Sequence, residues 1–311
     1  MVFGSLRALL PIIVLVLAGA SWLTAQVSSA QVSPAPELPV AQELVRAAVA
    51  NEVTAANDSS VKHMFRSWKK TPHGSQTRIY VETKDAMAGM TIASDDKPLS
   101  EEQVQAERGR LAGLVSNPEL LRRKQRQEKE EAEHTLRIVK ALPDALLFDY
   151  DGSLIGSPTL GSEGTQLVRL RFRPNPAYRP PSHVEDVLVG MKGVVLVDAT
   201  SRRIAQIDGT LFKEVTFGWG ILGHLDKGGH FLVEQREVGD GSWDISRMSL
   251  SFTGKILLFK SLTIKSEEVF SDFRRVPADT TFAQGVKMLE AEETRLAENQ
   301  KPGATADPKS H

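Results

Sequence analysis

Two pairs of aspartates, each close to a glycine, are the residues of this chain whose type and spacing could do chemistry. Asp149 and Asp151 follow the apolar run ALLF and precede Gly152, and Asp240 and Asp244 belong to the segment GDGSWD. Carboxylates in such positions can act as nucleophiles, as acids or bases, or as ligands of a divalent cation. The same residues are also typical of strand ends, because aspartate followed by glycine favours tight turns.

The segments LLFDYDGSLIG and GDGSWD resemble, in this order, two motifs of haloacid-dehalogenase-type phosphatases. The resemblance implies that Asp149 is the nucleophile, that Asp151 is the acid or base, and that the later motif binds Mg²⁺ together with the nucleophile. That family has a doubly wound parallel sheet, which needs a helix between successive strands. Residues 160–260 show strand patterns without such helices. We therefore expect these aspartates at strand ends and turns, and the phosphatase remains an alternative.

The glycines of the segment GWGILG match the spacing of a dinucleotide-binding loop. Gly218, Gly220 and Gly223 follow a predicted strand. Such a loop needs a helix whose N-terminus points at the pyrophosphate, and Gly228 with Gly229 stops any helix after barely two turns. We predict no cofactor, and interpret the segment as a flexible connection beside an apolar cavity that could act as a lid.

Metal and nucleophile chemistry has little support in the sequence. There are seven histidines but no HExxH or HxH pattern, and His224 and His230 flank the glycine-rich segment without a nearby pair of carboxylates. No GxSxG segment occurs, and the chain has no cysteine to supply a thiolate. The sequence therefore predicts no catalytic residue and no metal ligand.

Composition and charge exclude several classes of protein. The chain of 311 residues is 41% hydrophobic and 25% charged, as expected of a globular protein rather than a disordered or fibrous one. Its 38 basic and 39 acidic residues give a formal net charge of -1, so no excess of positive charge attracts a nucleic-acid backbone. Without cysteine the fold cannot rely on disulfides and must bury an apolar core.

Residues 1–30 have the three-part layout of a secretory signal peptide. The single charge of Arg7 precedes the apolar run ALLPIIVLVLAGASWL, and small residues follow. Cleavage after either Ala20 or Ala30 fits this pattern. The uninterrupted apolar core is shorter than the roughly 20 residues of a membrane helix, and a retained anchor is the alternative. We predict a periplasmic or secreted protein whose membrane association is peripheral at most.

The exported chain is predicted to form one domain over residues 40–299, behind a proline-rich spacer at 31–39 and ahead of a disordered tail at 300–311. Apolar residues recur at helical spacing over 40–53, and a final helix is expected over 281–299. The predicted domain therefore begins and ends with a helix.

A helical insertion is predicted over residues 100–142. Ser100 with Gln103 makes a capping box at its start, and Asn117, followed by Pro118, caps a second helix. This second helix is rich in charged residues and has only a thin apolar stripe. We interpret it as a solvated helix with charge pairs four residues apart, and a partner-binding coiled coil is the alternative.

Short strand patterns separated by glycine, proline and aspartate turns occur over 61–94 and throughout the chain after Pro143. No helical pattern of useful length separates the strands after Pro143. Neighbouring strands are therefore expected to be antiparallel, because parallel neighbours need long crossover connections. Met248, Leu250 and Phe252 share one face of their strand, so we expect the sheet to have an apolar side.

This order of elements resembles periplasmic lipoprotein carriers of the Lol type and uncharacterised secreted bacterial proteins of similar length. The resemblance rests on the export signal, the early helices, and the strands and turns from GMKGVVLVDATSRRIAQIDG to KILLFKSLTIKSEEVFSDFRRV. It covers residues 40–296 in layout. It implies an α+β fold in which a strongly curved antiparallel sheet, a half-barrel-like meander, has its concave apolar face covered by helices. Lipid acyl chains would occupy the space between them.

Large apolar residues of the last strands and of the glycine-rich segment are the candidates for lining such a cavity: Phe217, Trp219, Leu222, Phe231, Val233, Leu250, Phe252, Leu258 and Leu262. Each buried CH₂ contributes about 0.8 kcal/mol, so an alkyl chain needs no catalytic group to bind. We predict a non-enzymatic protein that binds a lipid, a lipid-modified protein or another hydrophobic ligand. A structural envelope protein that has a packed core and docks a partner protein is the main alternative.

Overall fold

A computed structural model describes residues 40–217, 223–239, 241–256 and 260–299. The predicted signal peptide, spacer and tail lie outside these residues. The helices described are α1 (Val40–Asn57), α2 (Glu101–Ser116), α3 (Pro118–Ala145), α4 (Phe282–Asn299) and a short 3₁₀ helix, η3 (Asp186–Gly190). The strands are β1 (His63–Thr71), β2 (Gly74–Val81), β3 (Ala88–Ser94), β4 (Lys97–Pro98), β5 (Leu146–Ile155), β6 (Gln166–Pro174), β7 (Met191–Asp198), β8 (Ile204–Leu211), β9 (Val215–Phe217), β10 (Gly223–Leu225), β11 (His230–Gly239), β12 (Ser242–Ile256) and β13 (Lys260–Arg275).

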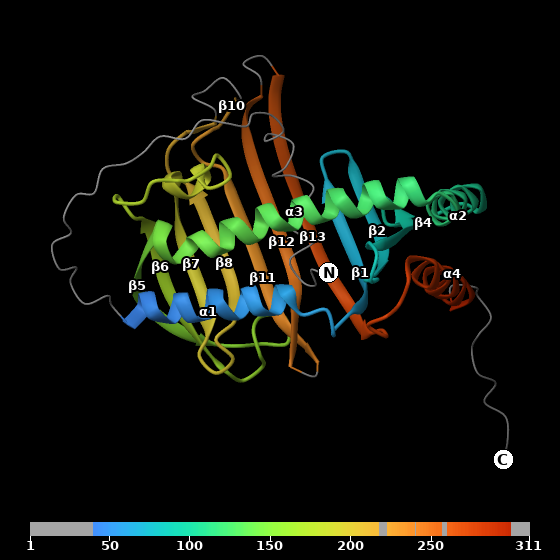
Figure 1. Ribbon diagram of the computed structural model, residues 1–311, viewed down its shortest axis with the longest axis horizontal. Helices are drawn as coiled ribbons and strands as arrows, with labels where there is room; N and C mark the ends of the chain where they lie inside the picture. Colours follow the sequence, from blue (N-terminus) through green and yellow to red (C-terminus); the bar gives the residue numbers. More distant parts are fainter. Residues whose placement is uncertain (1–39, 218–222, 240, 257–259, 300–311) are drawn as a thin grey trace.

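In the described part of the chain, thirteen strands form one open sheet, and all paired strands within it are antiparallel. The order across the sheet is β4-β3-β2-β1-β13-β12-β11-β8-β7-β6-β5, and the β9–β10 hairpin joins at β12 (Figure 1). The first strand, β1, pairs with the last strand, β13. The sheet is therefore two meanders joined along β13, and the predicted α+β fold with a curved antiparallel sheet is confirmed.

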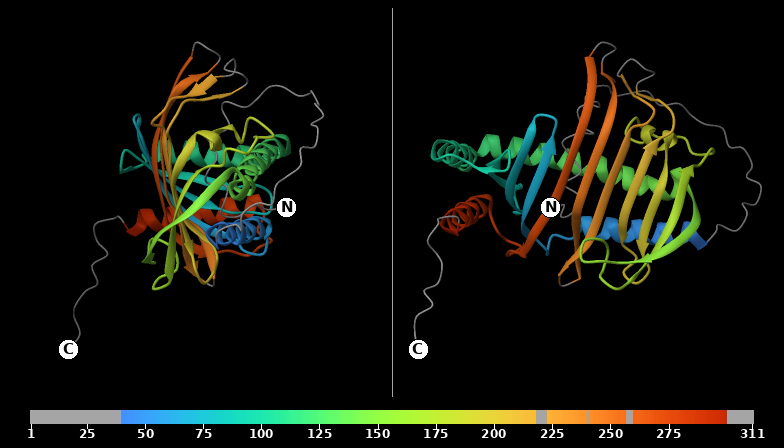
Figure 2. Two further views of the ribbon diagram at one scale, coloured as in Figure 1. Left: turned by 90° about the vertical axis from the view of Figure 1, so that its left-hand side faces the viewer. Right: turned by 180° about the vertical axis from the view of Figure 1, so that it is seen from behind.

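Helices α1 and α3 cover the concave face of the sheet. Both lie on the same side, and α3 crosses the strands from β6 toward β2, as the front and side views show (Figures 1 and 2). Apolar side chains of α1, α3 and strands β5 to β8 pack together in one core cluster, which includes Val45, Leu136, Leu142 and Val195. The layer of helices over the concave face, which the resemblance implies, is present.

Helix α4 packs on the other face of the sheet. Phe65 and Tyr80 line a cavity on the side of α3, whereas their chain neighbours Met64 and Ile79 join a core cluster with Phe282 and other residues of α4. Adjacent residues of a strand point to opposite faces. The terminal helix therefore covers the convex side of β1 and β2, whereas α1 and α3 lie on the concave side described above.

The predicted helix caps are confirmed. Ser100 accepts from the amide of Gln103 in a capping box, and the side chain of Asn117 caps the start of α3. Helix α3 continues beyond the predicted end at residue 142 and includes Pro143. Its last turn is held by α1, because the Gln42 side chain donates to the carbonyl of Pro143 and, at 3.0 Å, to the carbonyl of Leu146.

Strand β7 approaches β8 too closely at Gly193 for any side chain. A Cβ on Gly193 would lie 1.9 Å from the carbonyl oxygen of Asp208, and Gly193 pairs with Gly209 in the ladder. Glycine at such positions lets a sheet bend and its strands come together. This glycine pair contributes to the curvature that leaves room under the helices.

We expect the substitution Gly193→Ala to lower the free energy of unfolding by about 1–3 kcal/mol, the usual cost of overpacking. Urea denaturation followed by circular dichroism measures it. The control is Gly109→Ala in α2, where an added Cβ meets no atom within 4 Å, and which should be neutral or slightly stabilising. Equal stability of the Gly193→Ala and wild-type proteins would show that the strands can separate there without cost.

Candidate ligand-binding site

An apolar cavity of about 170 Å³ lies between α3 and the concave face of the sheet. Nearly all of its wall is carbon. The helical side of the wall comes from Thr135, Ile138, Val139 and Leu142 of α3 and from Val187 and Leu188 of η3. The sheet side comes from Phe172, Met191, Ile207, Leu225, Phe231, Val233, Leu250, Phe252, Leu262 and Ile264. We call this space the apolar cavity.

Five of the nine residues predicted to line a cavity lie in this wall: Phe231, Val233, Leu250, Phe252 and Leu262. They come from three neighbouring strands, β11, β12 and β13, and face α3. The side chain of Phe217 and the residues Trp219, Leu222 and Leu258 lie outside the described part of the structure. The proposed lid segment, residues 218–222, falls there too.

Sequence reasoning missed the contribution of α3 to this wall. Thr135, Ile138, Val139 and Leu142 are spaced by three and four residues, which places them on one side of the helix. Val139 and Leu142 are buried, as is Leu136, whereas Leu120 is 46% exposed. The signal was the apolar spacing in the last third of the helix. The high charge of the preceding residues concealed it.

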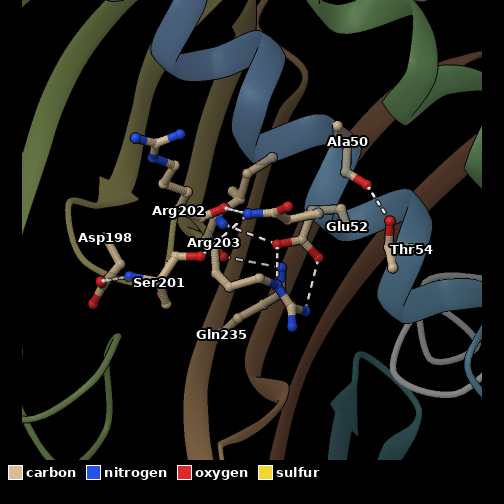
Figure 3. Close-up of polar contacts among 10 residues, drawn as sticks. Ala50, Glu52, Thr54, Asp198, Ser201, Arg202, Arg203 and Gln235 are labelled. Carbon is tan, nitrogen blue, oxygen red and sulfur yellow. Dashed lines mark hydrogen bonds and ion pairs between the residues drawn. The ribbon is translucent and has the colours of Figure 1, made fainter.

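A buried ion pair closes the cavity on the side of α1. Glu52, which is 3% exposed, points from α1 to Arg203, with oxygen–nitrogen distances of 2.8 and 3.0 Å (Figure 3). Glu52 also accepts the backbone amide of Ile204 at 2.9 Å, and the Arg203 guanidinium lies over the Trp243 ring. A carboxylate with three donors is well compensated for its loss of water.

Gln235 is the other polar side chain near this end of the cavity. Its amide nitrogen donates to the carbonyl of Ile204 at 3.0 Å, and its buried Oε1 has no hydrogen-bond partner (Figure 3). Together with Glu52, it gives the otherwise apolar wall a polar end at the base of α1. His183 also lines the cavity, and its Nδ1 pairs with Asp186 at 2.9 Å, while most of the remaining wall offers dispersion contacts.

The aspartates that resemble a phosphatase motif lie within a strand. Asp149 and Asp151 belong to β5, where Gly152 has a φ of 105° and the ladder to β6 shifts register. This is a bulge inside the strand, so the prediction that these aspartates mark a strand end is wrong. Asp151 pairs with Arg169 at 2.9 Å and also with Arg171. Hydrogen bonds from these two arginines lower the pKa of Asp151.

The second aspartate motif does not meet the first. Asp244 lies in β12, near the middle of the sheet, whereas Asp149 and Asp151 lie on β5 at its edge; Asp240 is outside the described residues. Asp244 is buried and its Oδ2 lies 3.5 Å from Nδ1 of His63. Neither the antiparallel sheet nor this separation matches the phosphatase resemblance, so the resemblance has no support in the described fold.

His224 does have carboxylates nearby, contrary to the interpretation from sequence. Glu214, His224 and Asp226 bring one possible ligand atom each within 4.8 Å of one another, at the β9–β10 hairpin. His224 Nε2 lies 3.3 Å from Asp226 Oδ1, while His230 pairs with Asp208 at 2.9 Å. The pairing of β9 with β10 brings Glu214 to this group, whereas Asp226 is only two residues from His224 along the chain.

These features define the class of the protein: an α+β protein with an open, curved antiparallel sheet and an apolar cavity under its concave-side helices. None of the described helices is long and apolar enough to cross a membrane.

No family model matches the chain, and no curated protein matches it. One solved structure that is similar is that of a DUF1329 family protein from Desulfovibrio piger ATCC 29098. The two share 9% sequence identity, the match covers 76% of this chain and 92% of the other, and the TM-score is 0.24. This likeness is too low to carry any functional inference. The resemblance to lipoprotein carriers stays a prediction.

Proposed function

We propose that this protein is exported to the periplasm or envelope and binds a hydrophobic ligand, without catalysis, in the apolar cavity under α3. The observation that carries the proposal is the composition of the cavity wall, in which α3 and three adjacent strands present apolar side chains to the space between them. Such a space favours an alkyl chain, because each CH₂ removed from water contributes about 0.8 kcal/mol.

The volume of the apolar cavity limits the size of the ligand that it can hold. Its volume is about 170 Å³, and an apolar cavity of about 150 Å³ accommodates benzene. The space under α3 therefore takes a single short alkyl segment or a compact hydrophobic molecule. A lipid-modified protein with several acyl chains would need the helices to move away from the sheet, so we favour a single-chain ligand.

We expect an organic extract of the protein, purified from cell envelopes without detergent, to contain a stoichiometric single-chain lipid by mass spectrometry. The cavity itself is tested with Ile138→Trp, which fills the space from α3. This variant should lose the extracted lipid and bind octanol at least about tenfold more weakly than wild type, as measured by calorimetry.

The matched control is Lys140→Trp, which adds the same ring on an exposed position of the same helix. It should keep wild-type binding. A clean extract together with no octanol binding by folded wild-type protein would contradict the proposal. That result would favour the alternative of a structural envelope protein with a packed core.

An observation that favours this alternative is the exposure of apolar residues where α2 meets α3. Val115 is 41% exposed and Leu120 is 46% exposed. Both lie far from the apolar cavity along the chain, near the Asn117 cap. Exposed apolar side chains that form a contiguous patch are typical of a surface that contacts another protein, and we take these two residues as the candidate contact. Loss of a copurifying envelope protein in the double variant Val115→Ser/Leu120→Ser would support that role.

A further inference from the structure

A second cavity lies under the N-terminal part of α3. Its volume is about 650 Å³, and it is lined by α3 together with β1, β2 and β13. We call it the polar cavity, defined by its charged residues Lys69, Arg78, Lys124, Glu128, Glu131 and Glu268. The charge pattern predicts a solvated face for this part of α3, but Lys124, Glu128 and Glu131 instead face this space.

One stripe of α3 lines both cavities. Lys124, Glu128 and Glu131 border the polar cavity, and Thr135 and Ile138 border the apolar cavity. Their spacing of three or four residues places them on one side of the helix. Glu131 and Thr135 are four residues apart, which is about 6 Å along the axis. The two cavities therefore border the same side of α3 within about one turn of each other.

Strand β13 also passes from one cavity to the other. Leu262 and Ile264 line the apolar cavity, and Glu268 and Phe270 line the polar one. Alternate residues of a strand share a face, so these side chains and the buried Ser266 between them form one wall. Strand β13 and helix α3 both present apolar side chains to the apolar cavity and charged side chains to the polar cavity.

The sheet wall of the polar cavity is an ordered polar surface. Lys69 lies 3.2 Å from Glu268, and the hydroxyl of Ser67 donates to the same carboxylate at 2.5 Å. Glu268 is 7% exposed, so this carboxylate is fixed in place rather than freely solvated. Arg78 extends this wall on β2, where it donates to Gln76 at 3.0 Å.

The helix wall has a matching arrangement. Lys124 lies 2.8 Å from Glu128, whose other oxygen accepts the backbone amide of Met87 at 3.0 Å. Glu131 accepts from Gln127 at 3.0 Å, and burial raises the pKa of Glu131. The cavity thus has three cationic and three carboxylate side chains. A ligand of one sign meets repulsion as well as attraction there, whereas a group with both signs can pair with each.

We propose that the polar cavity holds the head group of the molecule whose alkyl chain fills the apolar cavity, and that this head group is zwitterionic. The inference rests on the proposed function, because it takes the alkyl chain to lie in the apolar cavity. An anionic part of the head group pairs with Lys69 and Arg78, and its cationic part pairs with Glu131. The ligand class is a single-chain zwitterionic amphiphile.

The test compares four probes with the same short chain by calorimetry: octylphosphocholine, octyl phosphate, octyltrimethylammonium and octanol. Wild-type protein should bind octylphosphocholine at least about tenfold more tightly than each of the other three, since paired charges add to the same chain contacts. Lys69→Gln and Glu131→Gln should each weaken octylphosphocholine binding about five- to tenfold and leave octanol binding unchanged. Lys140→Gln, on an exposed part of α3, is the matched control and should change neither.

The outcomes separate this inference from the proposed function. Equal binding of all four probes, abolished by Ile138→Trp, would overturn the head-group assignment while supporting the apolar site. Absence of octanol and octylphosphocholine binding would overturn both. Preference for octyl phosphate or octyltrimethylammonium over octylphosphocholine would show that the cavity selects one sign of charge, and the zwitterion assignment would be wrong.

Discussion

Replacing Glu52 with alanine should lower the free energy of unfolding by about 3–5 kcal/mol, the range observed when one partner of a buried ion pair is removed. The substitution leaves the Arg203 guanidinium buried under α1 without its carboxylate, and removes the acceptor of the Ile204 amide. Glu52 holds α1 against the start of β8 through Arg203 and Ile204. Its loss should therefore also open the apolar cavity on the side of α1. Guanidinium denaturation at neutral pH measures the loss.

Glu43→Ala is the matched control for this prediction. Glu43 lies on the same helix but is exposed, and its pair with Arg46 is 3.8 Å long. Exposed pairs contribute about 0–1 kcal/mol, so the control should be close to wild type. The double variant Glu52→Leu/Arg203→Met should recover part of the loss, since a buried pair can be replaced by apolar side chains. Similar stability of Glu52→Ala and Glu43→Ala would mean that Arg203 finds other compensation.

The free energy of unfolding of the wild-type protein should fall between pH 5 and pH 8, and replacing Glu82 with glutamine should remove most of this fall. Glu82 is fully buried; burial, together with the charge of Asp244, raises its pKa from 4.5 to about 7. Its side chain accepts the backbone amide of His63 at 2.8 Å, and the charges of His63 and Lys62 oppose the rise. Each pKa unit corresponds to about 1.4 kcal/mol, so the cost of ionising Glu82 is on the order of 3 kcal/mol.

The sign of this effect follows from which state releases its proton first. Below pH 4.5 Glu82 is protonated in both states, and its full contribution to stability is present. As the pH rises toward 7 the unfolded chain loses the proton while the folded protein keeps it, so the free energy of unfolding falls. Above the folded pKa the loss is complete and constant.

His63 acts in the same direction. Burial lowers the pKa of His63, but the hydrogen bond and charge of Asp244, with the charge of Glu82, outweigh it and raise the pKa above 6.5; Arg275 opposes them. The stability that comes from protonated His63 is present below pH 6.5 and is lost as the pH rises through the raised value. The wild-type protein should therefore be measurably more stable at pH 5 than at pH 8.

Urea denaturation at several pH values between 5 and 8 tests this prediction. Glu82→Gln keeps an oxygen acceptor for the His63 amide but cannot ionise, so its stability should vary much less with pH. Glu43→Gln, at an exposed position of α1, should retain the wild-type slope. If Glu82→Gln and wild type have the same slope, the buried carboxylate is ionised throughout this range.

Several features of the fold could be predicted from local patterns in the sequence. Serine with glutamine at 100 and 103, and asparagine before proline at 117, are short-range signals whose hydrogen bonds close within one helical turn. They were predicted correctly because no distant residue is needed to form them. The alternation at Met248, Leu250 and Phe252 likewise fixed which side of β12 is apolar, and Leu250 and Phe252 do line the cavity.

The errors came where a distant contact decided the outcome. Asp151 followed by glycine predicted a turn, but β6 supplies Arg169 and Arg171, and their pairing keeps the aspartate inside a bulged strand. His224 was predicted to lack a nearby pair of carboxylates, yet the pairing of β9 with β10 adds Glu214 to Asp226, which is only two residues from His224 along the chain. In both cases strand pairing supplies a partner, Arg169 and Arg171 for Asp151 and Glu214 for His224, that a local pattern does not reveal.

What the sequence by itself determined is the kind of element and the face that must be buried, because periodicity and caps are properties of neighbouring residues. Only the tertiary structure decided that β1 pairs with β13, that Glu52 meets Arg203 from 151 residues away, and that one stripe of α3 faces both cavities. The spacing of side chains shows which side of a helix is apolar or charged, but it does not show which element packs against that side. The element that packs against this side depends on the packing of the whole chain. In this fold both a charged and an apolar part of the sheet lie opposite the single helix α3.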